Sequence, residues 1–198
     1  MNQENIQTIY INLDDSGKLT SKEKVAVYAG IVFLSKSEKD KFIAQYQNIL
    51  NSIKCKYCRK KSETCNKRCP EIKSSNISKN DRRRILNHIK RYMTVACIIK
   101  NSSIYDYIMK DKASKGRYLD FALRIFVKKI ILNLIKSKIV SPKTPVKLIL
   151  NIDEQATKNN GYYNLKDGIK EELLHGIYNY NYNVIHKPIL NELEVVLM

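Results

Sequence analysis

Acidic residues occur at three separated places in the sequence, where together they could hold divalent metal ions. Asp14 and Asp15 follow the first apolar run, Asp120 lies within a long helical pattern, and Asp153 and Glu154 end a later apolar run. Two Mg²⁺ or Mn²⁺ ions about 3.5–4 Å apart, held by carboxylates from different elements, can hydrolyse a phosphodiester. We therefore predict that Asp14, Asp120 and Asp153 hold the metals. Asp15 and Glu154 would assist or orient a water.

Each of these carboxylates also has a structural explanation. Residues 14–17 (DDSG) could form a turn between two hairpin strands, with aspartate accepting backbone hydrogen bonds. Asp120 could pair with Arg117 or Arg124 on a solvated helix face. Asp153 would end a buried strand, where a carboxylate without a partner is costly, so a metal ion or an arginine is expected nearby.

Four cysteines have the spacing of a metal site, C-x2-C-x6-C-x3-C, at Cys55, Cys58, Cys65 and Cys69. Paired thiols in an intracellular chain are more often metal ligands than disulfides, and Zn²⁺ takes four thiolates tetrahedrally. We predict a structural zinc knuckle inserted at residues 54–73. Free or redox-active thiols and disulfides remain open alternatives.

Basic residues are concentrated around these cysteines. The chain has 36 Lys and Arg against 19 Asp and Glu, a net charge of +17, and residues 36–91 alone hold 17 basic and 5 acidic residues. This surplus favours a polyanion through counterion release and predicts nucleic acid or a nucleoprotein as partner, although an AT-biased, lysine-rich genome would also explain it. The predicted contacts are Lys56, Arg59, Lys60, Lys61, Lys67, Arg68, Arg82, Arg83 and Arg84.

Three further residue groups have simpler expected roles. Cys97, in an apolar run, is expected in the core, and His88 on the surface of a helix. Tyr178, Tyr180 and Tyr182 could stack on bases or cover a sheet edge.

The apolar pattern predicts the elements that position these groups. Strands are expected over 6–13, 25–34, 94–100, 146–153 and 189–198, and helices over 37–53, 79–92, 114–136 and from a cap at Asn164. The result is a single α/β domain of residues 1–198 with a mixed sheet flanked by helices. Apart from the insertion between the second and third strands, the element order is that of a ribonuclease H-like core without its last helix.

Several stretches of the sequence resemble the domain-of-unknown-function family 3800. These are "LDDSG" at 13–17, "SKGRYLDFALR" at 114–124, "NIDEQATKNNGYYNLKDGIKEELLHG" at 151–176 and the cysteine-bearing insertion ending "CPEIK". The resemblance covers nearly the whole chain and implies a ribonuclease H-like fold and a nuclease role. It also implies that Asp14 and Asp15 occupy the family's Asp-Glu motif. The family's C-terminal helix with an Ala-Asp pair, which would supply a fourth carboxylate, has no counterpart in this sequence.

Two functions therefore follow as expectations. The first is a metal-dependent nuclease acting on RNA or DNA. The second is a catalytically incomplete binder of nucleic acid or nucleoprotein, such as a phage or mobile-element regulator. A third interpretation is that this chain is a fragment and that a separate chain supplies the remaining segment.

The polar N-terminus and the absence of an apolar run near 18 residues predict a cytoplasmic protein without a membrane partner, and a homodimer is left open.

Overall fold

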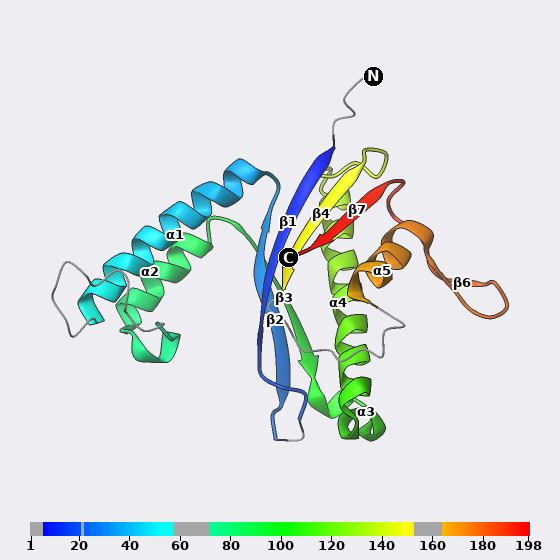
Figure 1. The fold of residues 1–198 in the computed structure, drawn as a ribbon, viewed down its shortest axis with the longest axis horizontal. Helices are drawn as coiled ribbons and strands as arrows, with labels where there is room; N and C mark the ends of the chain where they lie inside the picture. The colour runs from blue at the N-terminus through cyan, green and yellow to red at the C-terminus, as the bar shows by residue number, and fades with distance from the viewer. Residues whose placement is uncertain (1–5, 21, 58–71, 153–163) are drawn as a thin grey trace.

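The computed structural model describes residues 6–20, 22–57, 72–152 and 164–198, which build a five-stranded mixed sheet in the order β3-β2-β1-β4-β7 (Figure 1). β1 (Gln7–Ser16), β2 (Val25–Phe33) and β3 (Met93–Lys100) are antiparallel neighbours. β4 (Val146–Ile152) runs parallel to β1 and to β7 (Leu193–Leu197). β1 therefore lies in the middle of the sheet.

The strands form because apolar side chains recur at every second position. Ile9, Ile11 and Leu13 of β1 are buried, whereas the residues between them are partly exposed, and Leu148 and Leu150 repeat the pattern on β4. Successive side chains of a strand point to opposite faces, so these residues share one face of the sheet. That face is buried against α4.

The long helix α4 (Lys112–Lys136) covers the buried face of the sheet. It begins at Asp111, whose carboxylate accepts a hydrogen bond from the N–H of Ser114 at 2.7 Å. Its buried apolar side chains recur at the helical period and are Leu123, Phe126, Val127, Ile130, Ile131 and Leu134. The helix thus presents one apolar stripe to the sheet.

Two helices between β2 and β3 form an arm that projects away from the sheet, on the side opposite α4 in Figure 1. They are α1 (Lys36–Tyr57) and α2 (Lys79–Ile89), and they lie side by side. Ser78 begins α2, because its Oγ accepts a hydrogen bond from the N–H of Asp81 at 3.1 Å.

The remaining elements are short. The 3₁₀ turn η2 (Ser74–Asn76) precedes α2, and η3 (Asn101–Ser103) and α3 (Asp106–Lys110) connect β3 to α4. After β4, α5 (Leu165–Lys170) continues into the π-helical turn η4 (Glu171–His175), followed by the hairpin of β5 (Ile177–Tyr178) and β6 (Val184–His186). The predicted cap is present, since the side chain of Asn164 accepts from the N–H of Asp167 at 2.8 Å.

The predicted α/β class with a mixed sheet flanked by helices is confirmed, and the strand order is compatible with a ribonuclease H-like fold. Residues 54–57, predicted as the first part of the knuckle insertion, continue α1. The Tyr57 hydroxyl, which contacts Asp81 and the N–H of Ser78, ties that last turn to α2. Residues 58–71 lie outside the described chain. None of the described helices combines the length and apolar content needed to cross a membrane.

Candidate metal centre and nucleic-acid interface

The end of β1 places Asp14 and Asp15 on opposite faces of the sheet. Asp15 comes two residues after the buried Leu13 and pairs across the ladder with Tyr28, which is 1% exposed and belongs to the core under α4. Asp14 pairs with Ala29, an exposed residue on the other face. Of these two carboxylates, therefore, Asp15 is the one on the α4 side.

The turn after the carboxylates is fixed by a glycine and a buried amide. Gly17 has φ +80°, and a Cβ there would lie 2.6 Å from the carbonyl oxygen of Val25. The Nδ2 of Asn101 lies within hydrogen-bond distance of three carbonyls of the β1–β2 connection, those of Lys18, Thr20 and Glu23, at 2.9, 3.1 and 2.9 Å. The alternative of a turn over residues 14–17 is wrong for its first three residues, because Asp14, Asp15 and Ser16 continue β1 and pair with β2; Asp14 Oδ1 accepts from the N–H of Asp15 at 3.0 Å.

Asp120 is a buried carboxylate on the core-facing stripe of α4. It is 6% exposed, which excludes the alternative of a solvated helix face. Arg117, one turn before Asp120, lies 3.9 Å from Asp111, and Arg124, one turn after it, lies 3.9 Å from Glu171. A carboxylate in such surroundings needs hydrogen bonds or cations to stay charged.

A cavity of about 430 Å³ lies between the end of β1 and the first turns of α4. Asp15 and Tyr28 contribute from the sheet, and Lys115 and Leu119 contribute from the helix. Asp120 is the next residue along α4. The structure thus brings Asp15 close to Lys115 and Leu119 in the first turns of α4, whereas Asp120 is not among the residues that line this cavity.

β4 ends beside the middle of the carboxyl-terminal half of β1. Its last residue, Ile152, pairs with Leu13, and β1 continues for three more residues to Ser16. Asp153 and Glu154, predicted to follow there, lie outside the described residues.

The zinc site stays a prediction. Cys55 is exposed in the last turn of α1, and Cys58, Cys65 and Cys69 lie outside the described chain. Within the part of the chain that is described, no group of three or more His, Cys, Asp or Glu side chains could hold a metal ion.

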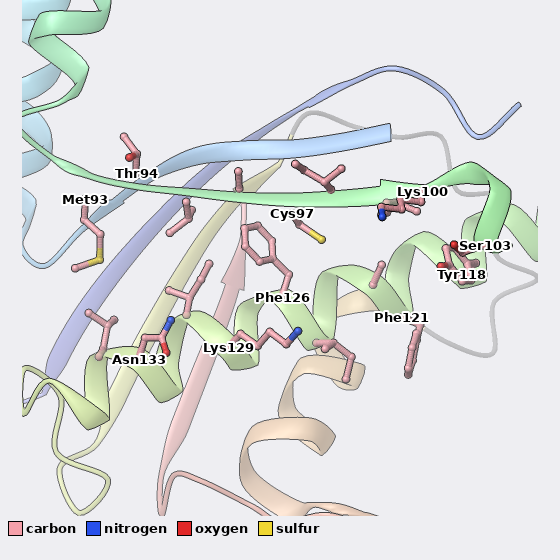
Figure 2. A pocket seen from close by; sticks show the side chains of 18 of the residues that line it. Met93, Thr94, Cys97, Lys100, Ser103, Tyr118, Phe121, Phe126, Lys129 and Asn133 are labelled. Carbon is pink, nitrogen blue, oxygen red and sulfur yellow. The ribbon is translucent and has the colours of Figure 1, made fainter. Parts of the chain in front are cut away.

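An open groove of about 920 Å³ runs between β3 and α4 (Figure 2). Cys97 and Phe126 point into it, and none of the described residues that line it is an Asp or Glu. Cys97 is half-buried, and burial raises the pKa of its thiol. It is therefore a protonated packing residue, close to the predicted core role.

The predicted nucleic-acid contacts that the structure describes have different surroundings. Lys56 Nζ lies 2.7 Å from Asp81 Oδ1, so its charge is paired within the arm. Arg82, Arg83 and Arg84 are exposed on α2. The others, Arg59, Lys60, Lys61, Lys67 and Arg68, lie outside the described residues.

Two expectations about aromatic and histidine residues are corrected. His88 is 4% exposed rather than on the surface, because its ring stacks on Phe42 with ring centroids 5.1 Å apart. Tyr180 and Tyr182 do not cover a sheet edge, since they are 90% and 88% exposed around the tip of the β5–β6 hairpin. Tyr178 is half-exposed at its base.

Sequence reasoning missed a buried charge cluster beside α4. Glu172 of η4 is 1% exposed, and its Oε1 lies 2.7 Å from Lys128 Nζ and 2.6 Å from His186 Nδ1. The helical period of α4 put Lys128 on the polar side of the predicted helix, so the sequence did not indicate its burial. Glu172 had no signal either, because its burial depends on a π-helical turn.

Neither a family model nor a curated protein matches this sequence.

Proposed function

We propose that this protein is a metal-dependent phosphodiesterase that acts on RNA or DNA. The observation that carries the proposal is that α4 presents the Asp120 carboxylate on its core-facing side, while the first turns of α4 share a cavity with Asp15 at the end of β1. Carboxylate oxygens are the ligands that Mg²⁺ and Mn²⁺ prefer. The adjacent end of β4 leads directly to Asp153.

The residues have separable roles in this proposal. Asp15 and Asp120 hold Mg²⁺ or Mn²⁺ from the strand and the helix, and Asp153 completes the set, with Glu154 beside it. The bound metals would polarise the phosphate and activate a water. Lys115, in the same cavity wall as Asp15, offers a cation to a phosphate oxygen. Asp14 lies on the other face, where its Oδ1 accepts a hydrogen bond from the N–H of Asp15.

The zinc knuckle at Cys55, Cys58, Cys65 and Cys69 is part of the same proposal. Cys55 is exposed in the last turn of α1, the end of this helix that lies away from β2 along the chain. A small metal-bound loop that starts there could extend the arm. Its basic neighbours would then be held in a fixed arrangement for phosphate contacts.

A second function rests on the arm alone. Its exposed arginines suit a polyanion whether or not the carboxylates cut, so the alternative is a protein that occupies nucleic acid or a nucleoprotein without hydrolysing it.

The deciding experiment is a cleavage assay on labelled single- and double-stranded RNA and DNA with Mg²⁺, Mn²⁺ or EDTA. We expect metal-dependent cutting that Asp15→Asn and Asp120→Asn each reduce by more than about 100-fold, since even the outer partners of metal ligands are worth 10–100-fold. Asp14→Asn is the matched control and should retain most of the activity. If Asp14→Asn lost the cutting activity and Asp15→Asn kept it, Asp14 rather than Asp15 would be the metal ligand. If every form bound nucleic acid and none cut it, the protein would be a binder without hydrolytic activity, which is the second function.

A further inference from the structure

One side of α2 carries a continuous polar stripe around a cavity of about 530 Å³. The cavity is lined from α2 by Asn80, Arg83, Arg84, Asn87, His88 and Arg91, and from α1 by Ile49. These positions recur at intervals of three and four residues, so they lie on one face of the helix and its C-terminal extension. Arg82 has the same charge but falls on roughly the opposite side of α2.

Among the described residues that line the cavity, three are arginines and none is an Asp or Glu. The acidic residue nearest in sequence, Asp81, is engaged elsewhere by Lys56, Tyr57 and Ser78. Three guanidinium groups around one concave space repel one another unless an anion enters, and the planar guanidinium suits the oxygens of a phosphate.

Two of the lining side chains are held in place by the arm itself. Arg84 Nη1 donates to Ser52 Oγ of α1 at 2.8 Å, which fixes one guanidinium at the junction of the two helices. His88 is locked by stacking on Phe42, and its buried Nε2 has no hydrogen-bond partner within the described residues. The side chains of Arg84 and His88 are therefore held in place before any ligand binds.

The arm leaves the sheet far from the carboxylates. Asp15 pairs with Tyr28 of β2, whereas the chain departs toward α1 after Phe33 and returns at Met93, which pairs with Val32. The five residues from Tyr28 to Phe33 span about 17 Å at about 3.3 Å per residue. A phosphate held by α2 is thus a different phosphate from the one beside Asp15.

We propose that this cavity, built on Arg83, Arg84, Asn87 and Arg91, anchors a backbone phosphate of the nucleic acid at a distance from the cleavage site. The inference rests on the proposed action on nucleic acid, and it assigns binding to one face of α2 rather than to its basic residues in general. Its consequence is that the anchor sets affinity, while the carboxylates set the rate of cutting.

The test measures binding of the full chain to fluorescein-labelled single- and double-stranded oligonucleotides in EDTA, across a series of salt concentrations. Arg83→Glu is compared with Arg82→Glu, which has the same charge change at the adjacent position but on the other side of α2. We expect Arg83→Glu to weaken binding at least about tenfold and to reduce the log–log salt slope by about 1, as expected for one lost phosphate contact. Arg82→Glu should change affinity less than about threefold.

Equal losses in the two variants, with unchanged thermal unfolding, would overturn the proposal, because the charge would then act only through the general field. Inorganic phosphate should compete with the oligonucleotide more effectively for wild type than for Arg83→Glu. If the protein cleaved nucleic acid and the two variants lost binding affinity equally, the phosphate anchor would be refuted and the proposed nuclease function would stand. A selective loss in Arg83→Glu without cleavage by any form would support the anchor and refute the nuclease.

Discussion

Two lysine–glutamate pairs of almost equal length lie in very different surroundings. Lys128 Nζ is 2.7 Å from Glu172 Oε1 with side chains 11% and 1% exposed, and Lys147 Nζ is 2.9 Å from Glu194 Oε1 with side chains 35% and 57% exposed. Removing one partner of a buried pair leaves a charge without compensation, whereas an exposed charge is resolvated by water. Burial therefore decides how much each pair contributes.

The comparison gives a quantitative prediction. We expect Lys128→Met to lower the free energy of unfolding by about 3 kcal/mol, because Glu172 would keep His186 alone as its close basic neighbour. Lys147→Met, the matched control, should cost less than about 1 kcal/mol. Urea unfolding of both variants at neutral pH measures the difference. Equal costs would show that Glu172 is charge-compensated without Lys128.

At the same scale, the sequence located the carboxylates but not their directions. The sequence shows apolar residues at every second position of β1, at Ile9, Ile11 and Leu13. This alternation puts Asp15, and not Asp14, on the face of the sheet that packs against α4. The resemblance instead drew attention to the first aspartate of the motif. The buried state of Asp120 follows from its place on the α4 stripe, which the helical period also contained.

A buried acidic residue, Asp81 of α2, is one of the contacts that join the two helices of the arm. Hydrogen bonds from Lys56 and Ser78, with a further one from Tyr57, hold the pKa of Asp81 below its ordinary value. A carboxyl whose folded pKa is depressed stabilises the fold above its unfolded pKa, near 3.8, and loses that contribution as pH falls through the folded value.

We therefore expect the packing of α1 on α2 to be insensitive to pH from neutrality to about 4 and to weaken below that. Asp81→Asn should lower arm stability at neutral pH and remove the acid-dependent part. Hydrogen exchange of the α2 amides, measured as a function of pH in the wild type and in Asp81→Asn, reports the stability of this packing. If Asp81→Asn showed an acid-induced loss of protection as large as the wild type, carboxyl groups other than Asp81 would cause it.

Elements with strong periodicity were predictable, and elements fixed by tertiary contacts were not. All five strands of the large sheet and the helices α1, α2 and α4 were expected from local pattern. The short helix α3 and the β5–β6 hairpin were missed, because neither carries a long apolar period. The extra turn of α1 was missed because it depends on Tyr57 reaching Asp81 and Ser78 of another helix.

The whole molecule is a sheet with an arm inserted into one hairpin. Val32 of β2 pairs directly with Met93 of β3, so the chain leaves and re-enters the sheet at neighbouring positions. The described aromatic contacts between arm and sheet involve Phe33, whose ring lies 5.2 Å from that of Phe42 and 5.9 Å from that of Tyr92. The core under α4 contains none of the α1 or α2 side chains.

This topology predicts that the sheet folds without the arm. Replacing residues 34–91 by Asn-Gly would join Phe33 to Tyr92 through a two-residue turn, the geometry that antiparallel neighbours favour. With both flanking aromatics changed to Thr, we expect cooperative unfolding with a loss of about 2 kcal/mol, the scale of one lost buried side chain. Circular dichroism during thermal unfolding tests this, and nucleic-acid affinity should fall together with the arm. A protein without a cooperative transition would mean that Phe33, Phe42 and Tyr92 form part of the folding core, and the arm could not then be treated as a separate binding element.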